Sequence, residues 1–217
     1  MHQEPLRTLL SIIRDLGSIS LYPPYSPGLP LKGERIVLRR FLPEDTEKRQ
    51  RWAKYHDPYL QRYNFPRRKP KQNRTSFIRL SDRIRIAVVN MDGELIGYAS
   101  LKSGIAEPIA SELGICFAAD QIGKGYGWET LLLLLPWTIS TLHLQSIYLE
   151  VDVINTSAVH LYQKSGFCVR QEFWRKEDDY NLRKHWVQIP FASFGVRWRG
   201  NQLEVLTWVM EWKPYVL

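Results

Sequence analysis

The sequence of 217 residues lacks the features that mark metal-binding, disulfide-stabilised or membrane-spanning proteins. It has only two cysteines, Cys116 and Cys168, and no Cys/His spacing typical of a zinc site. Both cysteines lie in apolar, strand-like surroundings, which predicts buried thiols in a reducing compartment. The longest apolar run, Leu131 to Leu135, ends at Pro136 and is too short to cross a bilayer. We therefore expect a cytoplasmic protein with no metal and no membrane span.

A P-loop is also absent, because no G-x-x-x-x-G-K-[ST] pattern occurs. The chain does contain a glycine turn, Gly123-Lys124-Gly125-Tyr126-Gly127, between a strand-like run (Glu112 to Phe117) and a helix-like run that begins near Trp128. Glycines allow positive φ and close approach of the backbone to a ligand. A helix that begins at such a turn presents unpaired N–H groups and the positive end of its dipole. The turn therefore predicts a ligand that carries phosphate.

Positive charge is concentrated in one part of the chain. The formal net charge is +8, and residues 62–85 contain nine Lys or Arg and a single acid, Asp82, so the remainder is neutral. Such a segment can attract an acidic partner. The alternative is a solvated loop, punctuated by Pro66 and Pro70, that leads into a strand.

The first 30 residues are typical of an appendage to one larger domain. Leucine and isoleucine recur at helical spacing between Leu6 and Leu16, and four prolines between Pro23 and Pro30 make an extended linker. The predicted helix of residues 1–30 would dock on its own domain, on a second copy in a homodimer, or on another protein. The full sequence is 44% apolar, and we expect residues 31–217 to form one substantial core.

The predicted elements of residues 31–217 form a mixed α/β (α+β) fold. A hairpin-rich first part is followed by strand–helix–strand–helix–strand, which indicates a mixed sheet with helices on both faces. The predicted strands are 35–40, 83–90, 95–102, 110–117, 147–153, 167–174 and 202–212, and the predicted helices are 43–63, 128–142 and 155–165.

A second motif makes the phosphate ligand specific. The segment from Asn155 to Phe167, N-x-x-A-x-x-L-Y-x-x-x-G-F, follows an alternating strand and lies 28 residues after the glycine turn. The two motifs at this separation resemble the GNAT superfamily of acyl-CoA-dependent N-acetyltransferases. Residues 35–45 and 198–210 resemble the first and last strands of its Rim-type branch, which acetylates protein N-termini. The resemblance covers about residues 33–212 and implies a GNAT fold with a mostly antiparallel sheet of about seven strands.

The resemblance also implies a cosubstrate, acetyl-CoA, and the residues that hold it. The glycine turn would bind the pyrophosphate, with a point charge from Lys124, and the strand before it would pair with the pantetheine arm. The cofactor-binding residues implied in this way are Ile115, Cys116, Phe117, Gly123, Lys124, Gly125, Tyr126, Gly127, Asn155 and Ser157.

Tyr162 and Glu112 are the catalytic candidates. Tyr162 would protonate the departing thiolate, and Glu112 would serve as the base for a charged amine. Both have structural alternatives, since Tyr162 fits a packed core tyrosine and Glu112 a salt-bridged strand residue.

Two departures from the family pattern keep a second function open. Ile122 stands where the family usually has an Arg or Gln that donates to phosphate, and the insertion at about 175–197 borders the expected acceptor site. The first hypothesis is transfer of an acetyl group to a protein N-terminus, a lysine or a small amine. The alternative is a weakly active or inactive GNAT-fold interaction module that docks on a larger assembly or an anionic partner.

Overall fold

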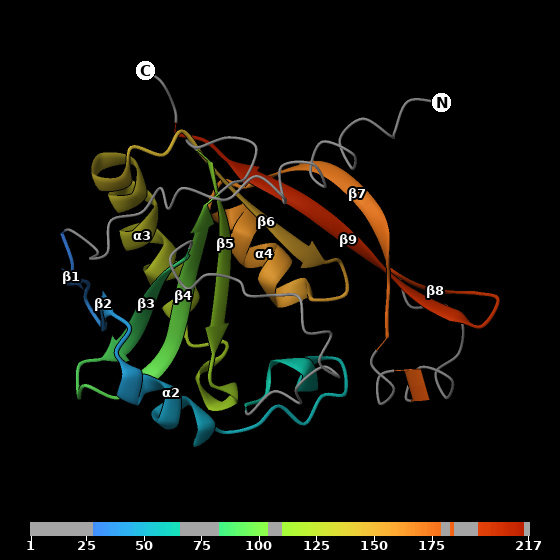
Figure 1. Cartoon of the computed structure of the whole chain (residues 1–217), viewed down its shortest axis with the longest axis horizontal. Helices are drawn as coiled ribbons and strands as arrows, with labels where there is room; N and C mark the ends of the chain where they lie inside the picture. Colours follow the sequence, from blue (N-terminus) through green and yellow to red (C-terminus); the bar gives the residue numbers. More distant parts are fainter. Residues whose placement is uncertain (1–27, 66–82, 104–109, 179–182, 185–194, 215–217) are drawn as a thin grey trace.

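The computed structural model describes residues 28–65, 83–103, 110–178, 183–184 and 195–214. Within these ranges nine strands form one sheet in the order β1-β2-β3-β4-β5-β6-β9-β7, and β8 pairs with β9 (Figure 1). The strands are β1 (Leu31–Lys32), β2 (Ile36–Arg40), β3 (Arg83–Asn90), β4 (Leu95–Ser103), β5 (Ala110–Phe117), β6 (Ser146–Asp152), β7 (Cys168–Lys176), β8 (Val196–Arg199) and β9 (Gln202–Trp212). All pairings are antiparallel except that of β5 with β6.

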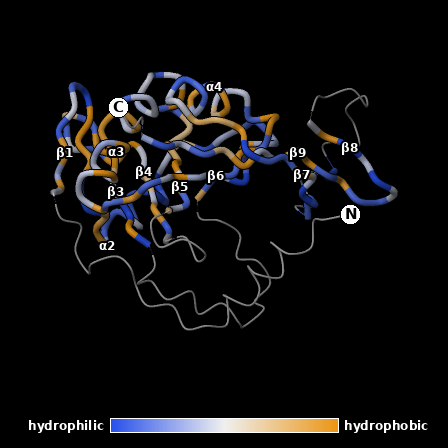
Figure 2. Tube along the Cα trace, turned by 90° about the horizontal axis from the view of Figure 1, so that it is seen from above, coloured by the Kyte–Doolittle hydropathy of each residue, from blue (hydrophilic) through white to orange (hydrophobic). Residues whose placement is uncertain are grey.

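Helices accompany the sheet in the described part of the chain. They are α2 (Pro43–Gln50), η1 (Leu60–Tyr63), η3 (Ala119–Gln121), α3 (Tyr126–Leu142) and α4 (Thr156–Lys164). The main hydrophobic core lies where α3 and α4 cover one face of the sheet, and Figure 2 shows hydrophobic residues concentrated there. Leu131 and Leu134 of α3 pack in it with Ile86 and Val88 of β3.

The opposite face has a smaller core under α2. Ala87 and Val89 alternate with Ile86 and Val88 along β3, so they point to the other side of the sheet. They pack there with Leu95, Phe41 and Trp52. Helices on both faces were predicted, and the structure confirms this arrangement.

Most predicted elements are confirmed, with β3, β5 and β9 at the predicted bounds. The helical region predicted over 43–63 is confirmed only at its two ends, because α2 ends at Gln50 and the short 3₁₀ helix η1 begins at Leu60. The count of seven strands was too low, since the short strands β1 and β8 extend the sheet. The predicted helix in residues 1–30 and most of the 62–85 segment and the 175–197 insertion lie outside the described residues.

Pro136 lies inside α3, where a proline removes one backbone hydrogen bond from the helix. The carbonyl that loses its partner belongs to Leu132, four residues earlier. Leu132 is 54% exposed and Pro136 is on the exposed side as well. Water can therefore take the place of the missing N–H donor, which explains why the helix continues to Leu142.

Candidate active site

The sheet opens between its two parallel strands. β5 and β6 pair over only three rows, the last joining Glu112 to Tyr148. Beyond this row β5 stays paired with β4 as far as Phe117, and β6 stays paired with β9 as far as Asp152. The strands therefore separate after Glu112, and each has an unpaired edge toward the opening.

The free edge of β5 carries the backbone groups of alternate residues. The N–H of Ala118 donates to the carbonyl of Ile96 (2.9 Å), so Ala118 and Cys116 turn their backbone groups toward β4. By antiparallel alternation, Ile115 and Phe117 turn theirs toward the opening. Of the three β5 residues predicted to pair with a pantetheine arm, Ile115 and Phe117 thus have backbone groups in position, and Cys116 does not.

The glycine turn has the backbone shape expected of an anion-binding helix start. Gly123 and Gly125 have φ of 75° and 84°, and Gly125 is the N-cap of α3. The first N–H groups of α3 have no partner within the helix and carry the positive end of its dipole. A Cβ built on Gly123 would have no described atom within 4 Å, so the space beside this residue is open. The turn can therefore accept a phosphate group.

Arg35 holds the turn from the side of β2. Its backbone N–H donates to Glu129 Oε1 (2.7 Å) and its Nε to Glu129 Oε2 (3.0 Å), which ties the start of β2 to the first turn of α3. Its Nη1 donates to the carbonyl of Lys124 (2.9 Å). These bonds fix the path of the turn before any ligand binds. Ile122, in contrast, is 50% exposed and offers no donor.

The two sequence motifs meet in space. A Cβ on Gly127 would lie 2.8 Å from Leu161 Cδ2 and 3.7 Å from Phe117 Cε2, so Gly127 permits close packing of α3 against α4 and β5. Lys164 Nζ also lies over the Trp128 ring, 4.6 Å from its centre. The glycine turn, the helix that carries Tyr162 and the free edge of β5 therefore converge on one place.

Tyr162 lies in the core with an unengaged hydroxyl. Its ring is packed edge-on against Phe167, with 5.6 Å between ring centres, and the residue is 8% exposed. Burial raises the pKa of the Tyr162 hydroxyl, and Tyr63 and Cys116 add to the effect. Among the described residues none is found to hydrogen-bond to this hydroxyl, although a buried tyrosine with a structural role usually finds a partner. Tyr162 therefore stays protonated at neutral pH and is able to donate.

Three further tyrosines gather at the opening, and sequence reasoning missed them. The hydroxyl of Tyr55 donates to the carbonyl of Phe117 (2.8 Å), and the ring of Tyr63 lies edge-on to that of Tyr55. Burial raises the pKa of Tyr55, Tyr59 and Tyr63. Their spacing of four residues in the sequence indicates that they could lie close together. Because 43–63 was predicted to be helical, the loop that brings them to the opening was not expected.

Asn155 and Ser157 occupy the start of α4. Asn155 Oδ1 accepts from the N–H of Ala158 (3.3 Å), as an N-cap residue does, and Asn155 partly offsets the raised pKa of Tyr63. Ser157 is exposed in the first turn of the same helix. The structure thus gives Asn155 a capping role, and contact of either residue with a cofactor stays a prediction.

Two carboxylates lie at the point where β5 and β6 separate. Glu112 belongs to the last paired row, and its Oε2 lies 3.6 Å from Lys102 Nζ. Glu150 is two residues beyond the partner of Glu112 on β6 and projects from the same face. The pKa of Glu150 is raised, first by partial burial and then by repulsion from Glu112. A carboxylate with a raised pKa next to an opening is a candidate proton acceptor that the sequence did not reveal.

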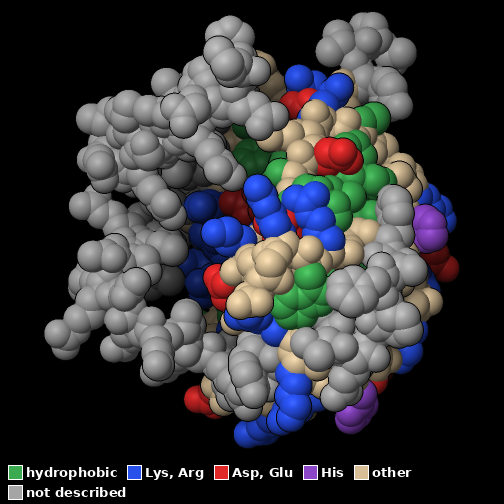
Figure 3. Space-filling model, turned by 90° about the vertical axis from the view of Figure 1, so that its right-hand side faces the viewer, with side chains coloured by type: hydrophobic (Ala, Val, Ile, Leu, Met, Phe, Trp, Pro, Cys, Tyr) green, Lys and Arg blue, Asp and Glu red, His purple; other side chains and the backbone are tan. Residues whose placement is uncertain are grey.

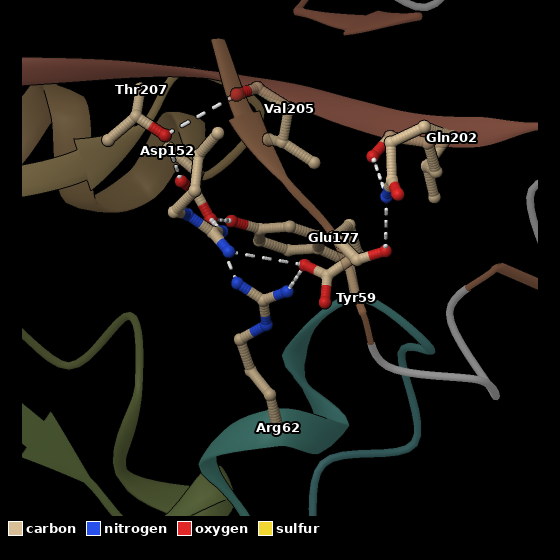
Figure 4. Close-up of polar contacts among 9 residues, drawn as sticks. Tyr59, Arg62, Asp152, Glu177, Gln202, Val205 and Thr207 are labelled. Carbon is tan, nitrogen blue, oxygen red and sulfur yellow. Dashed lines mark hydrogen bonds and ion pairs between the residues drawn. The ribbon is translucent and has the colours of Figure 1, made fainter. Parts of the chain in front are cut away.

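A buried network anchors η1 beside the opening (Figure 4). Asp152 at the end of β6 accepts from Tyr59, from Arg62 Nη1 (3.0 Å), from Arg175 Nη2 (2.7 Å) and from Thr207 Oγ1 (2.7 Å). Arg62 also donates to Glu177. Three of these four donors share Asp152 Oδ2, so this carboxylate holds η1, β7 and β9 together. The network thus fixes the segment that supplies the tyrosines.

The side of the molecule shown in Figure 3 has Lys and Arg side chains at its centre, next to carboxylates and hydrophobic side chains. Near this end of the sheet Arg197 pairs with Glu204 (2.7 Å) and lies over the Trp174 ring, 3.9 Å from its centre. Neither Cys116 nor Cys168 forms a disulfide, and Cys168 is exposed, contrary to the prediction that it is buried. The described residues include no cluster of metal ligands and no helix long and apolar enough to span a membrane.

Comparison with known proteins gives curated relatives with a stated activity. The chain is 33% identical over 85 residues to the spermidine N(1)-acetyltransferase of Escherichia coli strain K12, which is 39% of this chain and 46% of that one. It is 34% identical over 83 residues to the Vibrio cholerae enzyme of the same name, 38% of this chain and 48% of that one. The chain thus spans about half the length of the curated relatives it matches.

Solved structures share the fold. The spermidine N-acetyltransferase of V. cholerae, in complex with CoA and spermine, has a TM-score of 0.54 and 20% identity, with 81% of this chain and 95% of that chain covered. A GNAT-family acetyltransferase from Bacillus anthracis has a TM-score of 0.55 and 16% identity, with 85% and 98% covered. The family model described as "Acetyltransferase (GNAT) domain" matches residues 35–168, more than half of the sequence. The chain belongs to the GNAT acetyltransferase family.

Proposed function

We propose that this protein is an N-acetyltransferase that moves an acetyl group from acetyl-CoA to a primary amine. The proposal rests on one observation. Gly127 of α3 lies against Phe117 of β5 and against Leu161, the neighbour of Tyr162 on α4, beyond the point where β5 and β6 separate. One path then contains the glycine turn, a strand edge whose backbone groups face the opening, and a protonated tyrosine. Acetyl-CoA has a phosphate end, an amide-containing arm and a thioester, in that order.

Each part of this path suits one part of the cosubstrate. The N–H groups of the turn would bind the pyrophosphate, and Lys124 is exposed beside them. Ile115 and Phe117 would pair with the arm as a strand does, once the Tyr55 hydroxyl releases the Phe117 carbonyl. The thioester supplies an acyl carbon that an amine can attack. Cys116, Asn155 and Ser157 would contact the cosubstrate through side chains only.

The chain's own residues would handle the protons. As the amine nitrogen bonds to the acyl carbon and the carbon–sulfur bond breaks, the Tyr162 hydroxyl gives its proton to the departing sulfur. A cationic amine first gives one proton to Glu112 or Glu150, directly or through water, and becomes the neutral nucleophile. The second proton that its nitrogen loses, once the bond to the acyl carbon has formed, passes through water to the Tyr162 oxygen and restores the hydroxyl. An alkyl amine with a pKa of about 10.4 is almost fully protonated at neutral pH, so a base for the first proton is required.

The acceptor we propose is a small primary amine. Glu112 and Glu150 stand on the face of the sheet that an acceptor would approach, and two carboxylates favour a cationic substrate. The named activity of the spermidine acetyltransferases supports the same class. A protein N-terminus, implied by the resemblance to the Rim-type branch, is the competing acceptor, and it has no support among these relatives.

Calorimetry with acetyl-CoA and an acetylation screen test the proposal. We expect one binding site per chain, and faster acetylation of small amines than of peptides. Glu112→Gln and Glu150→Gln should shift the rise of kcat/KM to higher pH, with acetyl-CoA affinity unchanged. Absence of binding at millimolar acetyl-CoA would end the proposal, and faster turnover of peptides would reverse the choice of acceptor.

The second candidate function is an interaction module with little or no activity. Ile122 favours it, because an exposed isoleucine replaces a phosphate donor of the family. The N-terminal helix as a self-association or docking element and a cytoplasmic location stay predictions. Binding of acetyl-CoA without acetylation of any amine in the screen would favour this second function.

A further inference from the structure

A cavity of about 340 Å³ on the α2 face of the sheet lies outside the path proposed for acetyl-CoA. Its lining residues are Thr46, Arg49, Gln50, Phe65, Arg83, Arg85, Tyr98 and Ser100. Among the described lining residues three side chains are cationic and none is acidic. The others supply two aromatic rings, three hydroxyl groups (one of them on Tyr98) and one amide.

Two of the cations project side by side from β3. Arg83 and Arg85 alternate with the buried Ile84, so both point to the α2 face and both are exposed. Within the described residues neither guanidinium has a carboxylate partner within ion-pairing distance. Five N–H donors on each guanidinium form a fork that matches the oxygens of phosphate or carboxylate.

The third cation is held by aromatic rings. The guanidinium carbon of Arg49 lies 4.0 Å from the centre of the Phe65 ring and 5.1 Å from that of Tyr98. Trp52 stacks on Tyr98 from behind and meets Phe65 edge-on. The positive charge is therefore fixed in place next to an apolar surface before a ligand binds.

We propose that this cavity binds an oxyanion, a phosphate group above all, carried on an aromatic or apolar body. Three guanidinium groups suit a doubly charged anion better than a single carboxylate. Phe65 and Tyr98 line the same cavity, so the body of the ligand would contact the parts of these rings that Arg49 leaves uncovered. Arg83 and Arg85 belong to the basic segment 62–85, so this part of the segment would bind an anion and would not be merely a solvated loop.

The cavity lies on the same face as the carboxylates of the opening. Arg83 pairs with Lys102, Lys102 with Glu112, and Glu112 with Tyr148 in one row across four strands. Adjacent strands are about 4.8 Å apart, so Arg83 and Glu112 are separated by about 10 Å. The anion is therefore either a group on the acceptor amine or a separate ligand that binds next to the acceptor.

Calorimetry at low ionic strength with phenyl phosphate, inorganic phosphate and phenol tests the site. Phenyl phosphate should bind once per chain and more tightly than inorganic phosphate, and phenol should not bind at the same concentrations. The double variant Arg83→Gln/Arg85→Gln should weaken phenyl phosphate at least ~10-fold. Arg51→Gln, which removes an exposed charge outside the cavity, should change affinity less than ~2-fold. Equal affinity in the wild type and the double variant, or equal loss in both variants, would overturn the proposal.

Two further arms separate this site from the glycine turn and identify the source of the anion. Phenyl phosphate binding should persist in Gly125→Asp, and its loss there would place the ligand on the turn instead. In the acetylation assay, competition between phenyl phosphate and a phosphate-bearing amine indicates an anion on the acceptor, and non-competitive behaviour indicates a separate ligand. The binding arm needs neither acetyl-CoA nor turnover, so its failure is distinguishable from failure of the proposed acetyltransferase activity.

Discussion

The charge of the residue at position 125 should control CoA binding separately from fold stability. Gly125 has φ of 84° and is the N-cap of α3. Asp and Asn have nearly the same shape, and both tolerate left-handed backbone better than other residues do. A Cβ at this position would lie 3.2 Å from Arg35 Nη2, the end of a flexible side chain that can move. Gly125→Asp and Gly125→Asn therefore share the same strain and differ in one negative charge.

The expected size of the effect follows from Coulomb's law. Two unit charges about 6 Å apart interact by about 3 kcal/mol at an effective dielectric constant of about 20, which corresponds to ~100-fold in affinity. Arg35 would neutralise part of the new charge, so we expect Gly125→Asp to bind CoA between ~10-fold and ~100-fold more weakly than Gly125→Asn. The same charge should stabilise the fold by roughly 0.3–1 kcal/mol, since it interacts with the N-terminal end of the α3 dipole.

Calorimetry with CoA and thermal unfolding of both variants measure the two effects. The reasoning requires opposite signs, with Gly125→Asp at least as stable as Gly125→Asn and clearly weaker in CoA binding. Equal CoA affinity in the two variants would refute the assignment of this turn to the pyrophosphate. Lower stability of the Asp variant would refute the electrostatic account of the helix start.

Three other substitutions test the site and its support. Tyr162→Phe should lower kcat at least ~100-fold with unchanged acetyl-CoA affinity, as loss of a general acid does, and steady-state kinetics with calorimetry would show it. Gly127→Ala should destabilise the fold by about 1–3 kcal/mol in chemical denaturation because its Cβ would press on Leu161, and a neutral result would contradict that packing. Asp152→Asn should cost about 1–3 kcal/mol, because Arg62 and Arg175 lose one of the two carboxylates that they share and keep only Glu177, and Glu150→Gln is the control on the same strand.

Strand and helix positions followed from local pattern. The alternation along 83–90 and 147–153 and the glycine turn before α3 are short-range signals, and the strands and the helix appear there with small shifts. The segment 43–63 misled because Pro43 and the first-turn acids mark a true helix start, while nothing as clear marks its end at Gln50. Tyr55, Tyr59 and Tyr63 have helical spacing, but tertiary contacts with Phe117 and Asp152 hold them in a loop and a short 3₁₀ turn.

The opening itself could not be read from sequence, because alternation says which face a residue is on and not where a strand loses its neighbour. Glu150 is two residues beyond Tyr148, the partner of Glu112, so both carboxylates are on the same face of the sheet. Only the short pairing of β5 with β6, three rows long, places them where the two strands separate. The pairing can be this short because the outer edges of both strands are occupied. Since β4 and β9 hold β5 and β6 along most of their length, the backbone groups inside the opening are the ones left for a ligand.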